Sequence, residues 1–241
     1  MIRATSLTKR YGPVTAVDDA SFRCDPGTIT GFLGPNGAGK STTLRMITGL
    51  ARADSGSATI AGQPFTSLPN PARVVGTLLD ASAMNSGRTG RATLRIAATV
   101  TGASARRADD LLETVGLGAS AGRRVGAYSL GMRQRLGLAL ALIGEPSVLI
   151  LDEPANGLDP EGIAWIRAML RDFADRGGTV LLSSHLLHEV QATADHLVII
   201  AGGRIAAAGS TAALLAGAGQ TLEELFLSVT SAAGNQGAEN R

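Results

Sequence analysis

Apolar and polar residues alternate over the first 27 residues of the chain, which predicts β-strands joined by a turn at Gly12-Pro13. The short apolar run Ile29–Leu33 follows and predicts a strand that is buried on both faces. The chain is therefore expected to begin with β-structure.

The stretch Thr42–Leu50 changes to a helical period, because Leu44, Ile47 and Leu50 recur on one face of the predicted helix. The sequence Ser55-Gly56-Ser57 then predicts the turn of a hairpin over residues 54–62.

Residues 81–144 are predicted to form a helical insertion. In one of its helices the apolar residues Leu111, Leu112 and Val115 share a face, and the acidic residues lie on the others (Asp109, Asp110 and Glu113). The remaining core is expected to consist of residues 1–80 and 145–229, so that residues 1–229 make one domain.

Short apolar strands return after the insertion and alternate with helices. The predicted strands are Val148–Leu151, Thr179–Ser183, Leu197–Ile200 and Arg204–Ala208. This alternation predicts an α/β fold whose mostly parallel sheet is covered on both faces. A last helix is predicted over residues 222–229, and the small and polar residues 230–241 are predicted to be a disordered tail.

A glycine-rich loop between the strand at 29–33 and the following helix matches the phosphate-binding pattern G-x-x-x-x-G-K-[ST]. Its residues are Gly34, Pro35, Asn36, Gly37, Ala38, Gly39, Lys40 and Ser41. Glycines let backbone N–H groups wrap a phosphate, and the following helix directs its positive end at the anion. The chain carries 20 arginines and only two lysines, yet it places a lysine here, whose compact charge a planar guanidinium does not reproduce. Nucleotide binding is the leading hypothesis, with Ser41 as a Mg²⁺ ligand and Thr42 supporting the next phosphate.

The apolar strand Val148–Leu151 ends in two carboxylates, Asp152 and Glu153. A parallel sheet presents such residues at its carboxyl edge, where ligands bind in open α/β folds. Asp152 is expected to hold Mg²⁺ and Glu153 to take a proton from an attacking water. Solvated acids at a strand end are the alternative, and the phosphate loop earlier in the chain favours the functional interpretation.

With both motifs in this order, the chain resembles the ATP-binding subunits of ABC transporters over about residues 2–229. The resemblance implies a P-loop NTPase (RecA-like) core with an N-terminal antiparallel β subdomain and an inserted helical subdomain. It also implies that Tyr11 stacks on adenine, that Val17 packs near the nucleotide, and that Asp80 stands where the family usually has a glutamine that touches Mg²⁺ or its water.

The family's signature Leu-Ser-Gly-Gly-Gln is matched by Tyr128 followed by Ser129, Leu130, Gly131 and Met132. Ser129 and Gly131 keep the family's residues, and by resemblance this segment binds the γ-phosphate of ATP held by the opposite subunit. Leu130 and Met132 depart from the pattern.

Two further motifs follow the acidic strand. The segment Asn156-Gly157-Leu158-Asp159-Pro160 resembles the loop that crosses to the partner subunit, with Asp159 at its centre, although a proline-stopped turn would look similar. His185 resembles the histidine that contacts the γ-phosphate, although a lone histidine after a strand is more often structural.

Composition limits the function classes. Aromatic residues make up 3% of the chain, which argues against stacking platforms for single-stranded nucleic acid, and the net charge is only +2. The single cysteine excludes a disulfide within the chain. No apolar run approaches the ~20 residues that span a bilayer, and the first residues lack the apolar core of a signal peptide.

A GTPase is disfavoured because the chain has no Asn-Lys-x-Asp sequence to recognise guanine. ABC-type ATPases that act on the ribosome or on DNA remain the alternative, although the former usually carry two modules and the latter a long coiled coil. Asp80, the signature segment and the end Thr221–Leu227 resemble the bacterial export subgroup, which serves antibiotic, multidrug or polymer export.

The resemblance thus implies an ATPase that binds ATP and Mg²⁺ and works as a dimer, with a homodimer expected. Its other partner is a separate transmembrane permease, which holds the subunit at the cytoplasmic face of the membrane, and no nucleic-acid partner is expected. The sequence leaves open the cargo, the direction of transport and whether the paired subunits are identical.

Overall fold

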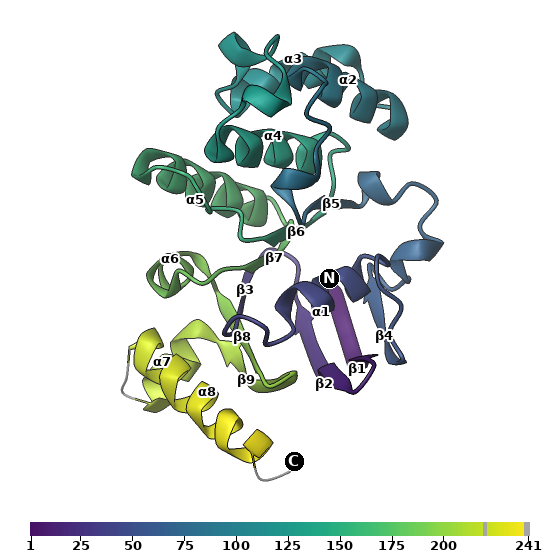
Figure 1. The fold of residues 1–241 in the computed structure, drawn as a ribbon. Coiled ribbons are helices and arrows are strands. Elements are labelled where there is room, and N and C mark those ends of the chain that lie inside the picture. Colours follow the sequence, from purple (N-terminus) through teal and green to yellow (C-terminus); the bar gives the residue numbers. More distant parts are fainter. Residues whose placement is uncertain (219–220, 239–241) are drawn as a thin grey trace. The chain divides into compact units, whose positions relative to one another are not determined.

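The structure is a computed structural model that describes residues 1–218 and 221–238 of the chain. It divides into two compact units, one made of residues 1–68 and 170–241 and the other of residues 69–169. Each unit is described by itself below. Figure 1 labels the helices and strands.

The first unit contains a three-stranded antiparallel sheet in the order β2-β1-β4. It is built from β1 (Ile2–Tyr11), β2 (Val14–Cys24) and β4 (Ser55–Ile60). The predicted alternation of residues 1–27 is confirmed, because β1 and β2 pair on either side of the turn at Gly12-Pro13.

The same unit contains four further strands in the order β7-β3-β8-β9. β3 (Ile29–Leu33) lies parallel to both β7 (Thr179–Ser183) and β8 (His196–Ala201), and β9 (Arg204–Ser210) lies antiparallel to β8. All residues of β3 and β7 are buried, as a parallel strand covered on both faces requires. The predicted strands are therefore confirmed.

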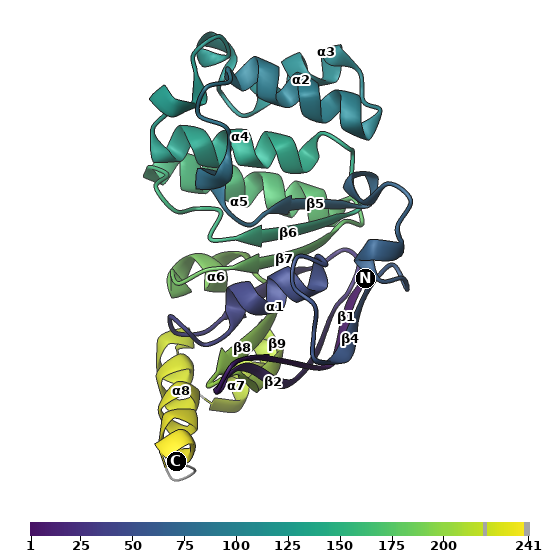
Figure 2. The ribbon, with the colours of Figure 1, turned by 45° about the vertical axis from the view of Figure 1, so that its right-hand side comes forward.

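Helices complete the first unit: α1 (Lys40–Ile47), α6 (Leu187–Thr193), α7 (Thr211–Ala218) and α8 (Leu222–Ala238), with a 3₁₀ turn at Phe65–Ser67. The last part of α5 (Pro160–Asp175) also belongs to this unit. Figure 2 shows α1 and α8 from a second direction.

Two expectations about helices of this unit were wrong. Leu50 does not share the buried face of Leu44 and Ile47, because α1 ends at Ile47, Gly49 adopts a left-handed φ of 69°, and Leu50 is 71% exposed. The last helix does not stop at residue 229 but continues to Ala238, and the disorder expected of residues 230–241 stays a prediction. Residues 230–238 carry no apolar period that would mark a helix in the sequence. Residues 239–241 of the predicted tail lie outside the described residues.

The hairpin expected over residues 54–62 is also wrong. Residues 55–60 form the single strand β4, which pairs with β1 instead of folding back on itself. Gly56 lies so close to the backbone of Ser6 that an added side chain would collide with it, and its φ is 81°. The glycine therefore marks an irregularity between two paired strands, and not a turn.

The second unit contains the parallel strands β5 (Val75–Leu78) and β6 (Val148–Asp152). Its helices are α2 (Gly90–Thr101), α3 (Ala105–Thr114), α4 (Leu130–Leu142) and the first part of α5 (Pro160–Asp175), with 3₁₀ turns at Pro71–Arg73, Ala81–Ala83, Gly118–Ser120 and Val125–Ala127. α2, α3 and α4 fall within the predicted insertion 81–144, and the domain limits themselves stay a prediction.

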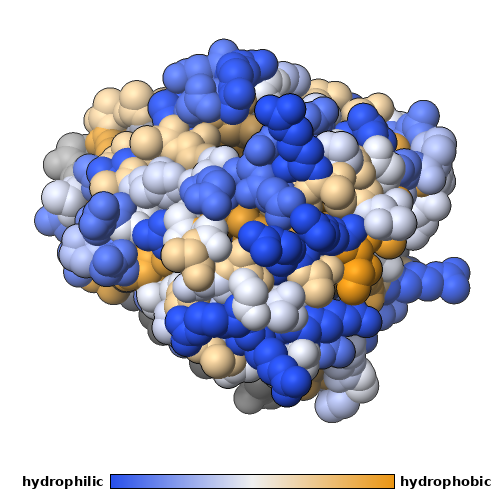
Figure 3. Space-filling model, turned by 90° about the horizontal axis from the view of Figure 1, so that it is seen from above, coloured by the Kyte–Doolittle hydropathy of each residue, from blue (hydrophilic) through white to orange (hydrophobic). Residues whose placement is uncertain are grey.

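The helical part of this unit has its own core, formed by α2, α3 and α4 and the turns between them. Leu111, Leu112 and Val115 are buried in it, as predicted, together with Leu94 and Leu136. Figure 3 views the molecule from the side of α2 and α3, and hydrophilic side chains cover much of this face. No helix in the described part of the chain is both long enough and apolar enough to cross a bilayer.

Candidate nucleotide-binding site

The predicted phosphate loop connects β3 to α1 and depends on two glycines. A side chain at Gly34 would collide with the carbonyl oxygen of Ile200, and one at Gly39 would collide with that of Ala16. Gly39 also has a φ of 106°, which an L side chain rarely adopts. Val17 is fully buried and backs the loop, because its Cγ2 would lie 3.1 Å from a Cβ at Gly39. The loop is held by close contact with its neighbours.

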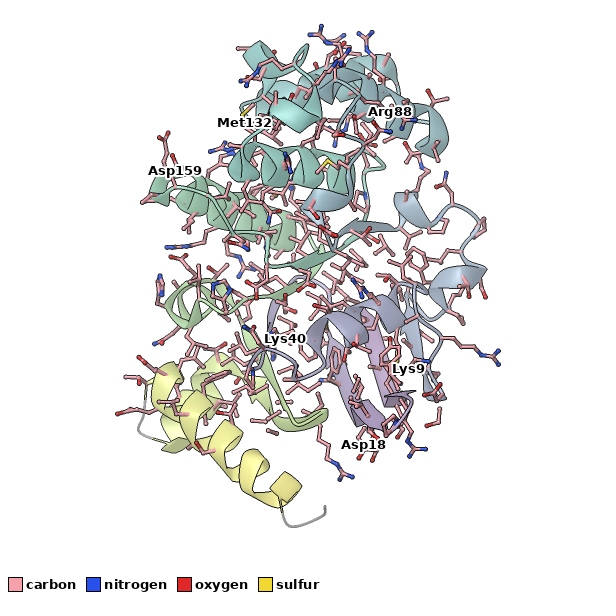
Figure 4. The ribbon with its side chains drawn as sticks, in the orientation of Figure 1. Lys9, Asp18, Lys40, Arg88, Met132 and Asp159 are labelled. Atoms are coloured by element: carbon pink, nitrogen blue, oxygen red, sulfur yellow. The ribbon has the colours of Figure 1, made fainter. Side chains whose placement is uncertain are left out.

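Lys40 is drawn into this loop. Its side chain is 8% exposed, and its Nζ donates to the carbonyl oxygens of Gly34 and Pro35, the latter at 3.2 Å. Figure 4 shows Lys40 where the loop enters α1. The first turn of α1 carries no acidic residue, so nothing on the helix itself offsets the positive end of its dipole.

The other residues of the loop divide by exposure. Pro35, Asn36, Gly37 and Ser41 are exposed and Thr42 is half-buried, whereas Ala38 is buried. The exposed members present backbone and hydroxyl groups to solvent beside a buried ammonium group. This arrangement suits an anion with several oxygens.

Tyr11 lies at the end of β1 with 51% of its surface exposed. Lys9 holds its Nζ 5.3 Å from the centroid of the Tyr11 ring and forms an ion pair with Asp54 at 3.0 Å. Asp54 also accepts a hydrogen bond from the backbone N–H of Arg10 at 2.6 Å. That bond, followed by the one from Lys9, lowers the pKa of the Asp54 carboxyl group below its ordinary value. The aromatic ring is thus fixed by a cation while half of its surface stays open.

His185 follows β7 and is exposed. In the parallel register of β3 and β7, Phe32 lies opposite Ser183. Gly34 comes two residues after Phe32, and His185 two residues after Ser183, so both leave the sheet at the same edge. The structure therefore brings the predicted histidine and the start of the phosphate loop to one edge of this unit.

The acidic residues belong to the second unit, at the end of β6. In the parallel register of β5 and β6, Leu78 lies opposite Leu151, so Asp80 and the pair Asp152-Glu153 leave their strands at the same edge. Glu153 has a φ of 50°, a left-handed backbone that costs an L residue roughly 1–3 kcal/mol. Strain of this kind in a non-glycine residue is typical of functional positions.

The signature segment begins α4. Ser129 caps the helix, because its hydroxyl accepts a hydrogen bond from the backbone N–H of Met132 at 3.2 Å. Gly131 lies against the loop that follows β6, where an added Cβ would be 2.7 Å from the carbonyl oxygen of Gly157. The structure thus joins the signature segment to the loop 156–159.

The two departures from the signature have structural roles. Leu130 packs over Gly157, because a Cβ added to Gly157 would be 2.6 Å from the Cδ2 of Leu130. Leu130 is nevertheless 48% exposed. Met132 is partly buried against the core of α2, α3 and α4. Figure 4 shows Met132 at the start of α4. Leu130 adds an apolar contact where the family's glycine has no side chain. Met132 adds one where the family's glutamine would offer a polar side chain.

Asp159 and Asp80 each begin a helical turn. Asp159 caps α5 through a bond from the N–H of Gly162 to its Oδ1 at 2.9 Å, and it is exposed. Asp80 precedes the turn at Ala81–Ala83, and its Oδ1 accepts hydrogen bonds from the N–H and hydroxyl of Ser82 at 2.8 and 2.6 Å. A glutamine could not offer the same charged cap. Capping of this turn therefore explains why aspartate can stand at position 80.

Two residues that the sequence did not assign stand out. Lys9 contacts Tyr11, and its only sequence signal was the rarity of lysine in this chain. Gln134 lies in α4, is 5% exposed and donates to the carbonyl oxygen of Glu153 at 3.1 Å. In the sequence, Gln134 is recognisable only as an amide residue on an otherwise apolar helical face. Its partner becomes known only from the structure. No group of three or more His, Cys, Asp or Glu residues that could hold a metal occurs among residues 1–218 and 221–238.

A glycine-rich phosphate loop that opens a helix, together with a strand that ends in two carboxylates, defines the class of P-loop NTPases. The comparisons with known proteins narrow this class. The family model described as "ABC transporter" matches residues 17–156, and the chain belongs to that family. Its expected identity as an ATP-binding ATPase subunit of a transporter is confirmed.

Named bacterial relatives agree with this assignment. The chain is 42% identical over 208 residues to the bacitracin transport ATP-binding protein BcrA of Bacillus licheniformis, covering 85% of this chain and 68% of that protein. It is 37% identical over 205 residues to the lantibiotic transport ATP-binding protein SrtF of Streptococcus pyogenes, covering 85% and 89%. It is 37% identical over 231 residues to the daunorubicin/doxorubicin resistance ATP-binding protein DrrA of Streptomyces peucetius, covering 94% and 70%.

Solved structures show the same fold. An ATP-binding subunit of an ABC transporter superposes with a TM-score of 0.88 at 29% identity, covering 95% of this chain and 99% of that one. A dimeric ATP-binding cassette bound to ADP and phosphate superposes with a TM-score of 0.80 at 20% identity, covering 88% and 99%. The predicted α/β P-loop NTPase fold is confirmed.

Proposed function

We propose that this chain hydrolyses ATP to power export of a cargo through a separate transmembrane subunit. The observation that carries the proposal is the phosphate loop, whose glycines are held against neighbouring backbone and whose buried Lys40 donates into the loop at the start of α1. Such a loop suits the phosphates of a nucleotide.

In the first unit, ATP is bound by its two ends. Tyr11 takes the adenine ring on its exposed face, and Val17 supports the loop from behind. The ammonium group of Lys40 exchanges its carbonyl partners for phosphate oxygens, which stabilises their charge in a buried setting. Ser41 and Thr42 offer hydroxyl groups beside it.

The candidate metal ligands Ser41, Asp152 and Asp80 offer hydroxyl and carboxylate oxygens. These are the ligand atoms that Mg²⁺ prefers. When bound, the ion would offset phosphate charge during the reaction. Asp80 and Asp152 leave the parallel strands β5 and β6 at one edge, which supports the assignment of both to one ligand set.

Glu153 acts as the general base in this proposal. Its carboxylate takes a proton from water as the water oxygen forms a bond to the γ-phosphorus, and the bond to the β,γ-bridging oxygen breaks to release ADP. His185 donates a hydrogen bond to the γ-phosphate and so stabilises its developing charge. The strained backbone of Glu153 supports its assignment to a functional role.

Two copies of the chain are expected to close around two ATP molecules. The start of α4, with Ser129, Leu130, Gly131 and Met132, would meet the γ-phosphate bound by Lys40 of the other copy. Asp159 would lie at the crossing between the copies. The absence of acidic residues from the first turn of α4 supports this role, because the end of the helix attracts an anion.

Export through a membrane partner is supported by the relatives, whose names refer to bacitracin transport, lantibiotic transport and daunorubicin/doxorubicin resistance. We infer that the chain docks on a permease at the cytoplasmic face of the membrane and powers export of an antibiotic or another drug. ATP-driven closure and reopening of the dimer would transmit force to that permease.

The test is affinity purification of the Glu153→Gln variant from detergent-solubilised host membranes in the presence of ATP. The variant should bind ATP without turning it over and should retain a multi-span membrane protein in near-equal amount. Recovery of ribosomes or DNA in place of a membrane protein would contradict the transport role and favour an ABC-type ATPase of another class. Normal turnover by the variant would remove Glu153 as the base.

A further inference from the structure

Gln134 is a polar side chain in a buried part of the second unit. It lies on α4, between the signature segment at the start of that helix and the apolar residues Leu136 and Leu138. It is 5% exposed, and its Nε2 donates to the backbone carbonyl oxygen of Glu153 at 3.1 Å. Only the NH₂ end of the amide can donate to a carbonyl, so this contact also fixes the orientation of the amide.

The carbonyl group of Glu153 is held from two sides. Besides the bond from Gln134, it accepts one from the backbone N–H of Asn156 at 3.1 Å. A carbonyl oxygen has two lone pairs, and both are used here. The peptide that follows Glu153 is thereby fixed, while φ at Glu153 is held at 50°. These constraints set the direction in which the carboxylate leaves the backbone.

Packing alone does not explain the amide at residue 134, because burying an amide group is unfavourable in free energy. Its Oε1 is buried and has no hydrogen-bond partner among residues 1–218 and 221–238. An unsatisfied buried acceptor destabilises a fold, and an apolar residue of similar size would avoid that loss. The benefit of the residue therefore lies in the one bond that it makes, which reaches the backbone of Glu153.

We propose that Gln134 is a positioning residue that holds the Glu153 backbone in its strained conformation and so aims the carboxylate for proton abstraction. This inference rests on the proposed role of Glu153 as general base. Because Ser129 caps the same helix five residues earlier, α4 links the segment that meets the partner's ATP to the residue that activates water. A shift of α4 on dimer closure would reach Glu153 directly through this bond.

Two substitutions test the proposal. Gln134→Met keeps the length of the side chain but removes the donor, and Gln134→Glu keeps the shape but replaces the donor with an acceptor. Both should lower kcat by about 10- to 100-fold, as expected when a catalytic group is displaced by a fraction of an ångström, while KM for ATP changes less than about twofold.

The pH profile separates the two variants. Burial favours the neutral form of a carboxyl group, and a protonated carboxyl can donate where a carboxylate cannot. The kcat of Gln134→Glu relative to wild type should therefore rise as the pH falls from about 8 to about 6. The kcat of Gln134→Met relative to wild type should not change with pH. A purely structural role would give no such difference.

Asn70→Asp is the matched control. Asn70 lies in the same unit, and its amide donates to the backbone carbonyl oxygen of Thr101 at 3.3 Å, so the change removes the same kind of bond away from Glu153. It should leave kcat and its pH profile at wild-type values. Thermal unfolding of all variants, with ATP binding, shows whether each is folded.

A double-mutant comparison decides the mechanism even if the substitutions lower stability. If Gln134 acts through Glu153, adding Gln134→Met to Glu153→Gln should produce no further loss of single-turnover rate. A full additional loss in the double variant, or wild-type kcat in both single variants, would overturn the proposal. Rapid turnover by Glu153→Gln itself would instead overturn the assignment of the base, so the two failures are distinguishable.

Discussion

At the scale of single residues, the site depends on where one ammonium group is held. Lys40 is buried and donates to two carbonyl oxygens of its own loop, so its charge is held within the candidate phosphate loop. Arginine is ten times more common in this chain, but its planar guanidinium does not reproduce the compact charge of lysine.

The substitution Lys40→Ala should therefore reduce affinity for ATP by about 10- to 100-fold, since a charge-assisted hydrogen bond contributes roughly 1.5–3 kcal/mol. Equilibrium binding of a fluorescent ATP analogue measures the change. Arg45→Ala is the control, because Arg45 is an exposed cation on the same helix, and it should bind as wild type does. Equal affinity in Lys40→Ala would contradict the assignment of the loop.

A second residue-scale prediction concerns Gly39. The change Gly39→Ala combines a φ of 106° with a collision against the Ala16 carbonyl oxygen, whereas Gly177→Ala has a comparable φ of 89° and no atom within 4 Å. The left-handed backbone alone costs about 1–2 kcal/mol, and overpacking adds about 1–3 kcal/mol. Urea unfolding should show the larger loss for Gly39→Ala, and equal losses would mean that the loop relaxes away from β2.

At the scale of elements, α2 and α3 are joined by one acidic residue. Asp109 on α3 accepts hydrogen bonds from Arg91 at 3.1 Å and Arg95 at 2.7 Å, both on α2. The bond from Arg95 lowers the pKa of the Asp109 carboxyl group below its ordinary value. A lowered pKa means that this group stabilises the fold at neutral pH, and that the contribution is lost as the pH falls through the folded-state pKa.

Asp109→Asn should consequently lower the Tm at pH 7, and the difference from wild type should shrink as the pH falls below about 4. Thermal unfolding at both pH values measures it. Asp110→Asn is the control, because the Asp110 carboxylate pairs with Arg106 at 3.9 Å in a pair that is largely exposed, and such a pair contributes little. A Tm difference for Asp109→Asn that persists unchanged at low pH would exclude the electrostatic explanation.

At the scale of the whole molecule, Ser129 has two roles in the proposed dimer, helix capping and phosphate binding, and the two can be tested separately. The hydroxyl of Ser129 caps α4 through Met132 N–H, and aspartate caps helices equally well. Ser129→Asp should therefore keep the Tm of the monomer, but its charge would repel the γ-phosphate held by the other copy.

In a Glu153→Gln background, ATP should shift the chain from monomer to dimer on size-exclusion chromatography, and Ser129→Asp should abolish the shift. Ser129→Thr, which keeps a neutral capping hydroxyl, is the matched control and should still dimerise. An undiminished dimer with Ser129→Asp would mean that this segment does not meet the nucleotide of the second copy.

The sequence predicted the parts whose signal is local. The strand predicted at 148–151 and the apolar face of Leu111, Leu112 and Val115 follow from short-range periodicity, and the structure has both. Two of its expectations failed at glycines whose backbone conformation the apolar pattern does not reveal. Gly56 predicted a turn, but it is required by the approach of Ser6, and Leu50 continued a helical pattern that Gly49 interrupts.

By itself, the sequence determined the family and the fold class, and it offered candidate residues for a phosphate and a metal, because these depend on motifs that are contiguous along the chain. Only the tertiary structure decided how the residues are held. The ion pair of Lys9 with Asp54, the packing of Leu130 on Gly157 and the bond from Gln134 to Glu153 all join segments distant in sequence. Their energies arise from contacts made on folding, which no local pattern of apolar and polar residues encodes.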